Sequence, residues 1–176
     1  MLRSACSDRS IGKNWLEAWR NVAEICGLIY RPGWINDLCF VGAVLAAIVY
    51  WIILSVAGAG SPLRGTGSDP LVVLSIVLWQ PVFEEVFFRG VFQGILLEET
   101  GRRLLCGPLT LANVVASAAF ALAHLPTHQF LWTGGIFVVS LALGYLRERL
   151  GSLYPPALLH MYYNGGYLLL AGWAQT

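Results

Sequence analysis

The sequence has little charge for its length, and this excludes several classes of protein. Only 12% of its 176 residues are charged, whereas soluble proteins average roughly a quarter. Eleven Lys and Arg residues stand against ten Asp and Glu residues, so the net charge of +1 offers no basic excess for nucleic acid. With 57% hydrophobic residues and a mean hydropathy of +0.65, the chain is too apolar for a cytosolic globular domain of this size.

Other familiar signatures are also missing. The first 13 residues are polar and contain no apolar run, so a cleaved signal peptide does not account for the hydrophobicity. No GxSxG elbow is present, and no cysteine has a histidine beside it in the sequence, which disfavours a covalent nucleophile. The cysteines lack CxxC or zinc-ribbon spacing, so a disulfide scaffold is not expected. They are Cys6, Cys26, Cys39 and Cys106.

What the sequence does contain is a series of long apolar stretches. A bilayer core about 30 Å thick needs about 20 apolar helical residues, because backbone groups in lipid must be bonded within the segment. A link rich in Gly, Ser and Pro separates the first stretch from the second. We therefore predict an all-α, multi-pass transmembrane helical bundle with about five spans. The predicted spans are residues 38–57, 71–97, 109–125, 130–146 and 153–173.

An amphipathic helix is predicted before the first span, over residues 15–30. It belongs to a cytoplasmic N-terminal segment at 1–37, which is followed by the transmembrane domain at 38–176. The apolar residues of the helix recur at helical spacing and its charged residues fall largely elsewhere. The helix can lie in the membrane interface or pack on cytosolic loops, since both placements share this periodicity. Its apolar positions are Trp15, Trp19, Val22, Cys26 and Ile29.

The basic residues predict the orientation of the bundle. With five spans, nine of them fall in the N-terminal segment and the links on its side of the membrane, whereas Arg64 alone lies on the opposite side. The remaining one, Arg89, lies within a span. The N-terminus is therefore predicted to be cytoplasmic.

Three charged residues lie inside the second span, where each costs several kcal/mol unless it faces the bundle interior or a water-filled cavity. Glu85 and Arg89 are four positions apart, in the favourable acid-before-base order, and are expected to pair. Glu84 points about 100° away around the helix. Glu84 is therefore the candidate reactive carboxylate, and Pro81 is expected to bend the helix just before it.

Two further spans contribute polar groups. His124 shares a helix face with Phe120 in the third span, and His160 shares a face with Asn164 in the fifth. Counted at about 1.5 Å per residue from the predicted boundaries, these groups and Glu84 lie roughly 10–22 Å into the membrane, which is compatible with one cavity. Taken singly, His124 and Asn164 would be read as packing residues, and the acid–base pair as a structural lock. Together, they are more buried polarity than packing requires.

This set of groups supports hydrolysis of an amide bond at membrane depth. A carboxylate and a neutral imidazole that share a water can deprotonate it, and Glu84 with His124 is the predicted pair. His160 and Asn164, one turn apart, can then donate hydrogen bonds to the oxyanion of the tetrahedral intermediate. A zinc ion held by a glutamate, His124 and His160 is the alternative mechanism. Because no HExxH motif is present and the histidines lie on separate spans, the metal-free mechanism is preferred.

Three motifs carry a resemblance to a known family. EEVFFR (84–89), FALAH (120–124) and HMYYN (160–164) resemble the EExxxR, FxxxH and HxxxN/D motifs of the CPBP family, the CAAX-protease and bacteriocin-processing group of intramembrane endopeptidases. The resemblance covers about residues 71–172. It implies a helical-bundle peptidase of a bacterial inner membrane, and descriptions of the family as metalloproteases compete with the glutamate mechanism. We expect no cofactor, with zinc as the alternative. The implied catalytic residues are Glu84, His124, His160 and Asn164, with Glu85 and Arg89 in support.

The resemblance also implies partners. The expected substrate is a membrane-associated protein cut at a C-terminal tail or CAAX-like site, and the compact chain mildly favours the bacterial sorting type. Gly90 and Gly94 form a GxxxG motif that is expected to pack within the chain, so a monomer is favoured. The alternative function is a non-proteolytic membrane scaffold or bacteriocin-immunity protein that keeps the polar cluster as structural glue. A proton-coupled transporter is disfavoured because the spans show no repeat pair.

Overall fold

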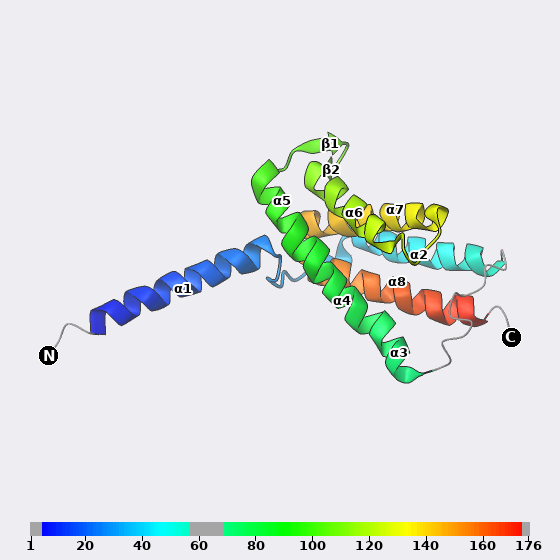
Figure 1. Ribbon diagram of the computed structural model, residues 1–176, viewed down its shortest axis with the longest axis horizontal. Helices are drawn as coiled ribbons and strands as arrows, with labels where there is room; N and C mark the ends of the chain where they lie inside the picture. The colour runs from blue at the N-terminus through cyan, green and yellow to red at the C-terminus, as the bar shows by residue number, and fades with distance from the viewer. Residues whose placement is uncertain (1–4, 57–68, 174–176) are drawn as a thin grey trace.

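The computed structural model describes residues 5–56 and 69–173, which form a bundle of helices, one helix that leads away from it and a short hairpin (Figure 1). The predicted Gly, Ser and Pro-rich link at 57–68 lies outside the described residues. The elements are α1 (Ala5–Ile25), a 3₁₀ turn (Trp34–Asn36), α2 (Leu38–Val56), α3 (Pro70–Leu74), α4 (Gln80–Glu85), α5 (Gln93–Thr100), β1 (Leu104–Cys106), β2 (Leu109–Thr110), α6 (Leu111–His124), α7 (Phe130–Leu150) and α8 (Tyr154–Trp173).

Each of the five predicted apolar stretches is helical over most of the length that the structure describes. The second is one continuous helix, Pro70–Thr100, in which π-helical segments join α3, α4 and α5; we call it the site helix. By length and composition, the site helix and α7 can each cross a membrane, whereas Leu38–Ile53 and Leu111–His124 are shorter apolar helices. The chain is thus consistent with a helical membrane protein, and the count of five spans stays a prediction.

The prediction of a purely helical fold is wrong at one place. Residues 109–110, assigned to the third span, instead form β2, which pairs antiparallel with β1. Gly107 has a φ of 53° and forms the turn, because glycine adopts this left-handed conformation without strain. The third helix therefore begins at Leu111, where the Thr110 hydroxyl accepts a hydrogen bond from the Asn113 amide and caps it.

Burial on the site helix is the reverse of that in a soluble helix. Glu85, Arg89 and Gln93 are fully buried, whereas Phe83 and Phe87 are more than half exposed. A soluble protein buries apolar side chains and exposes charges. Polar groups inside and apolar groups outside are instead expected where lipid is the solvent.

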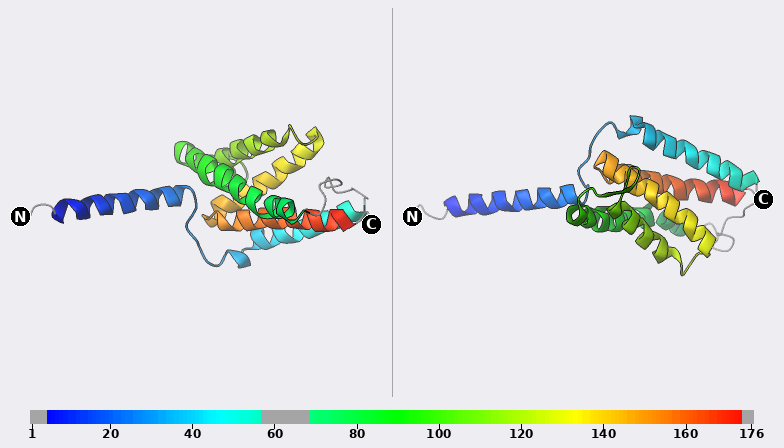
Figure 2. Two further views of the ribbon diagram at one scale, coloured as in Figure 1. Left: turned by 60° about the horizontal axis from the view of Figure 1, so that its bottom comes forward. Right: turned by 90° about the horizontal axis from the view of Figure 1, so that it is seen from above.

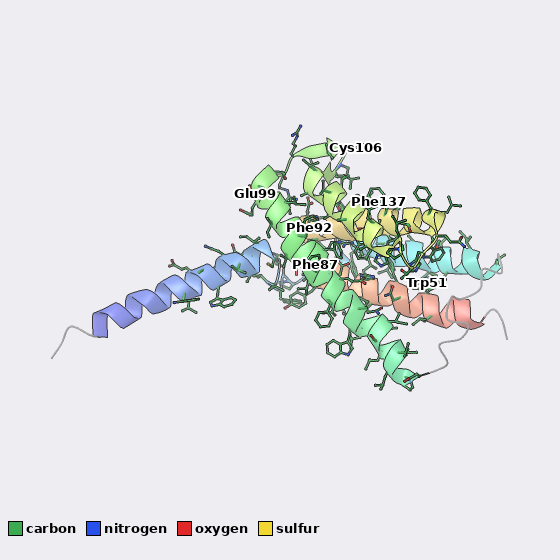
Figure 3. The ribbon with its side chains drawn as sticks, in the orientation of Figure 1. Trp51, Phe87, Phe92, Glu99, Cys106 and Phe137 are labelled. Atoms are coloured by element: carbon green, nitrogen blue, oxygen red, sulfur yellow. The ribbon has the colours of Figure 1, made fainter. Side chains whose placement is uncertain are left out.

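The apolar core lies between α2, α7 and α8. Trp51 of α2 is buried in the region where α2 and α8 lie side by side (Figure 3), with its ring 4.8 Å from that of Tyr162. A Cβ on Gly166 would collide with the Trp51 ring, so glycine allows these two helices to approach closely. At the start of α2, Asp37 accepts hydrogen bonds from backbone amides and pairs with Arg149 of α7. Burial opposes ionisation of Asp37, but these hydrogen bonds outweigh it and lower its pKa.

The N-terminal helix differs from its predicted range of 15–30, because α1 begins at Ala5 and ends at Ile25. Gly27 ends the helix with a left-handed φ of 67°. The Gly27 amide donates to the Glu24 carbonyl and the Leu28 amide donates to the Ala23 carbonyl, which is the hydrogen-bond pattern of a Schellman cap. The helix points away from the end of the bundle (Figure 2). Its Trp15 and Trp19 side chains are more than 60% exposed, and their interfacial placement stays a prediction.

The end of α1 is docked on the site helix through the predicted GxxxG motif, which confirms its packing within the chain. A Cβ on Gly94 would lie 2.5 Å from the Ile25 carbonyl oxygen, and one on Gly90 would lie 3.3 Å from that of Cys26. Arg147 of α7 donates a hydrogen bond of 2.7 Å to the same Ile25 carbonyl. A cation at this helix C-terminus also suits the helix dipole.

We predict that Gly94→Ala loosens this joint, because its methyl group would overlap the Ile25 carbonyl. The expected loss is about 1–3 kcal/mol of unfolding free energy in detergent, with faster proteolysis between α1 and α2. Gly42→Ala is the control, since an added Cβ there meets no atom within 4 Å. Equal proteolysis and stability of the two variants would contradict the docking role of Gly94.

Candidate active site

The site helix changes its winding on both sides of the two adjacent acids. The π-helical segment Ser75–Trp79 comes just before Pro81, and a second one, Val86–Phe92, follows Glu85. The Gln80 amide bonds the Ser75 carbonyl five residues back, a wider turn than the α-helix allows. Pro81 itself has no amide hydrogen to donate. The disturbance predicted near Pro81 is therefore a change of helical winding, a feature frequent at functional sites.

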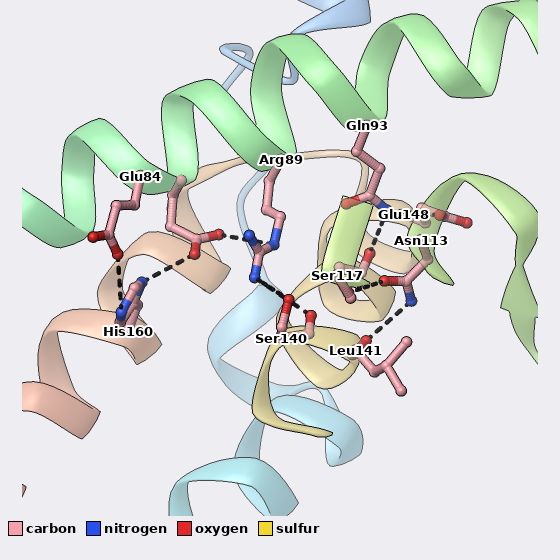
Figure 4. Close-up of polar contacts among 11 residues, drawn as sticks. Glu84, Arg89, Gln93, Asn113, Ser117, Ser140, Leu141, Glu148 and His160 are labelled. Carbon is pink, nitrogen blue, oxygen red and sulfur yellow. Dashed lines mark hydrogen bonds and ion pairs between the residues drawn. The ribbon is translucent and has the colours of Figure 1, made fainter. Parts of the chain in front are cut away.

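The two acids lie in different surroundings, and His160 of α8 lies between them (Figure 4). Glu85 is fully buried, with one carboxylate oxygen 3.0 Å from His160 Nδ1 and the other 3.6 Å from Arg89 Nε. The Glu84 side chain is 31% exposed, and its Oε2 is 3.7 Å from His160 Nε2. The predicted pairing of Glu85 with Arg89 is thus present, and Glu84 remains the more accessible carboxylate.

Arg89 ties the site helix to two other helices. Its guanidinium donates a 2.9 Å hydrogen bond to the Ser140 hydroxyl of α7. The guanidinium carbon also lies 4.5 Å from the centre of the Phe120 ring of α6, a cation–π contact. Arg89 therefore holds the buried charge of Glu85 and the positions of α6 and α7 at the same time.

His124 reaches this cluster through Phe120. The two rings are 4.6 Å apart, and the Phe120 ring is 5.9 Å from that of His160. His124 Nδ1 lies 2.8 Å from the Phe120 carbonyl oxygen. When that nitrogen carries the hydrogen, Nε2 is the acceptor that can bind a water. The structure thus brings Glu84 close to His160, whereas the predicted partner His124 is linked to this cluster by its contact with Phe120.

Asn164 lies one turn beyond His160 on α8, as the sequence predicts. Its side-chain amide donates a 3.0 Å hydrogen bond to the Ile76 carbonyl, inside the first π-helical segment of the site helix. The amide nitrogen carries two hydrogens, so one of them is left for another acceptor. In this structure Asn164 thus also supports the altered winding that precedes the acids.

Comparison with known proteins assigns the chain to a family. Residues 66–166, more than half of the chain, match the family described as "Type II CAAX prenyl endopeptidase Rce1-like". The chain belongs to this family. Membership of this family implies a protease of the CAAX type and, together with the apolar helices, a membrane protein. It is also 28% identical over 155 residues to an uncharacterized 24.3 kDa protein of Escherichia coli, an alignment that covers 76% of this chain and 69% of the relative. No solved structure matches the chain.

The arrangement does not bring together the donors of the alternative zinc site. Among residues whose side chains the structure describes, no group of three or more His, Cys, Asp or Glu is placed to hold a metal ion. Glu84 and Glu85 approach opposite nitrogens of His160, so the two carboxylates and one of those nitrogens do not converge on a point. His124, the third donor of that alternative, contacts Phe120 and His128 rather than either acid. The metal-free mechanism stays a prediction.

Sequence reasoning missed several buried polar residues of this endopeptidase. In the sequence they are isolated polar residues within apolar stretches, and helical periodicity does not indicate which neighbouring helix they face. All but one of them bond another helix or the hairpin, and the exception, Ser117, donates to Asn113 on its own helix. They are Gln93, Thr110, Asn113, Ser117, Ser140 and Glu148.

We predict that Arg89→Met lowers the unfolding free energy by about 3–5 kcal/mol, because Glu85 is left buried without its counter-charge. Unfolding of the purified protein in detergent measures this loss. The double variant Glu85→Gln with Arg89→Met should lose less than the two single variants added together. Strict additivity would show that the two charges do not depend on each other.

Proposed function

We propose that this protein is an intramembrane endopeptidase that uses a glutamate-activated water to cut a membrane-associated protein in a C-terminal tail or CAAX-like segment. The observation that carries the proposal is the division of labour between the two adjacent acids. Glu85 is buried and bound to Arg89, whereas Glu84 keeps an accessible carboxylate beside His160. An acid without a fixed counter-ion is the one available to take a proton from water.

The roles of the other groups follow from their contacts. Glu84 takes a proton from the water, the resulting hydroxide attacks the peptide carbonyl, and the same carboxyl then returns the proton to the leaving amine. His124 holds the water through Nε2, since Nδ1 faces the Phe120 carbonyl. Asn164 donates a hydrogen bond to the oxyanion, and His160 donates another from Nε2 when both of its ring nitrogens carry hydrogen, since Nδ1 already faces Glu85. Because 3.7 Å from Glu84 is beyond hydrogen-bond length, His160 Nε2 is available for another partner.

The setting of the reaction is proposed from the charge distribution and the apolar surface. The basic residues predict a cytoplasmic N-terminus, and the resemblance of the motifs implies a bacterial inner membrane. The protein acts as a monomer without a bound cofactor, and its partners are the lipid bilayer and a protein or peptide substrate cut in a C-terminal tail or CAAX-like segment. The tryptophans of α1 then contact the membrane surface.

A second candidate function is a non-proteolytic scaffold or immunity protein. It is favoured by the bonds that Arg89 and Asn164 make between helices, which are those expected of structural glue. Under this function, the acids would hold the helices together and no peptide would be cut.

The variant Glu84→Gln separates the two functions, because the amide keeps the shape of the side chain but does not accept the proton. We expect peptide cleavage to fall by about 10²–10⁴-fold with an unchanged melting temperature. The assay uses the protein in proteoliposomes with a farnesylated CAAX peptide and, in parallel, an unlipidated peptide with an apolar tail.

The exposed Glu99 provides the control, since Glu99→Gln should leave the rate unchanged. Full activity of Glu84→Gln would remove Glu84 from the role of base. Cleavage of neither peptide by the native protein would favour the scaffold.

Chelation tests the mechanism separately. We expect the native protein to keep its cleavage rate after prolonged dialysis against a strong chelator, because the carboxylate activates the water without a metal. Metal content is measured on the same samples. Loss of activity that zinc alone restores would overturn the metal-free mechanism.

A further inference from the structure

A second buried carboxylate, Glu148 of α7, lies beyond the acids that carry out the proposed reaction. Its side chain is 3% exposed. One oxygen, Oε1, accepts a 2.7 Å hydrogen bond from the Gln93 amide of the site helix and a 2.6 Å hydrogen bond from the Thr110 hydroxyl. The other oxygen lies 3.8 Å from Arg102, whose side chain is 68% exposed. Glu148 thus joins three separate parts of the chain.

These contacts continue the line of bonds that begins at the candidate active site. Along the site helix, Arg89 bonds Ser140 of α7, and one turn further Gln93 bonds the Gly144 carbonyl and Glu148 (Figure 4). Ser140, Gly144 and Glu148 are themselves four residues apart on α7. A Cβ on Gly144 would overlap the Asn113 side chain, so α6 is also packed tightly at this point. The site helix and α7 are therefore held in one register by consecutive polar contacts.

The line of bonds passes from Glu148 into α6 through Thr110. The Thr110 hydroxyl donates to Glu148 and accepts from the backbone amide of Asn113, so one atom both caps α6 and anchors it to α7. The Asn113 side chain donates to the Leu141 carbonyl of α7 and accepts from Ser117. Thr110 and Asn113 are almost fully buried. The position of α6 is thus set at its first turn.

The same helix carries Phe120 and His124, whose placement the proposed reaction needs. Phe120 lies against the Arg89 guanidinium, and His124 lies against Phe120. A shift of α6 along α7 would move both rings relative to Glu84. His160 would not move with them, because it lies on α8 and is hydrogen-bonded to Glu85. An error of about 1 Å in the placement of a catalytic group can cost about 100-fold in rate.

We propose that Glu148 is a positioning residue for the active site: it holds Thr110 at the start of α6 and thereby sets the distance of His124 from Glu84. This inference rests on the proposed endopeptidase function. A carboxylate suits the task because one oxygen accepts two hydrogen bonds, and an ionised acceptor strengthens both. The ion pair with Arg102 does not by itself explain why a charged residue is buried here, because Arg102 is largely exposed and such pairs contribute little to stability.

The test compares Glu148→Met, which removes the acceptors, with Glu148→Gln, which keeps one. In proteoliposomes with the farnesylated peptide, we expect Glu148→Met to lower kcat by about 10–100-fold with little change in KM. Glu148→Gln should stay within about threefold of the native rate, because its amide oxygen still accepts from Gln93 and Thr110. Thr110→Val should behave like the first variant and Thr110→Ser like the second.

A spectroscopic readout makes the test independent of activity. The chain has three histidines, so the NMR spectrum of protein labelled at the histidine rings is simple. In folded Glu148→Met and Thr110→Val, the His124 signals should shift while those of His160 stay in place.

Unchanged His124 signals, or equal shifts of His124 and His160 together with a lowered melting temperature, would overturn the positioning role. If the native protein cuts no peptide, the proposed function fails, while the histidine signals still decide whether Glu148 positions α6.

Discussion

A pair of opposite charges held away from water, Glu85 with Arg89, constrains the packing of this membrane protease. Removing two charges from water costs several kcal/mol each, and their attraction offsets this only when further groups bind the remaining donors and acceptors. His160 is hydrogen-bonded to one carboxylate oxygen, and Ser140 and the ring of Phe120 contact the guanidinium. Among the described residues, Glu85 Oε2 and Arg89 Nε and Nη1 have no hydrogen-bond partner, so only the ion pair offsets the cost of burying them. Three helices must therefore converge on the site helix at this level.

This constraint has a consequence for the neighbouring acid. Since Glu85 occupies Arg89, Glu84 has an accessible carboxylate without a fixed cation beside an imidazole. The same convergence brings Phe120 into contact with both His124 and Arg89. A structural ion pair and a reactive carboxylate thus come from two consecutive residues of one helix, and the proposed hydrolysis uses the difference between their surroundings.

Much of this arrangement was predictable because it depends on local pattern. Apolar runs long enough to span lipid predicted the helices, and the spacing of Glu85 and Arg89 predicted their contact. The hairpin at residues 104–110 was missed, since short strands between apolar helices leave little periodic signal. The end of α1 was placed too late, because Gly27 stops a helix only through its left-handed backbone.

By itself, the sequence determined that the chain is apolar and helical, which motifs hold ionisable groups, and which of two adjacent acids has a cation one turn away. Only the tertiary structure decided that Glu84 meets His160, that His124 approaches through Phe120, and that Glu148 joins α7 to the start of α6. The physical reason is that periodicity specifies the faces of each helix, whereas partners across helices depend on register and rotation, which are set by packing.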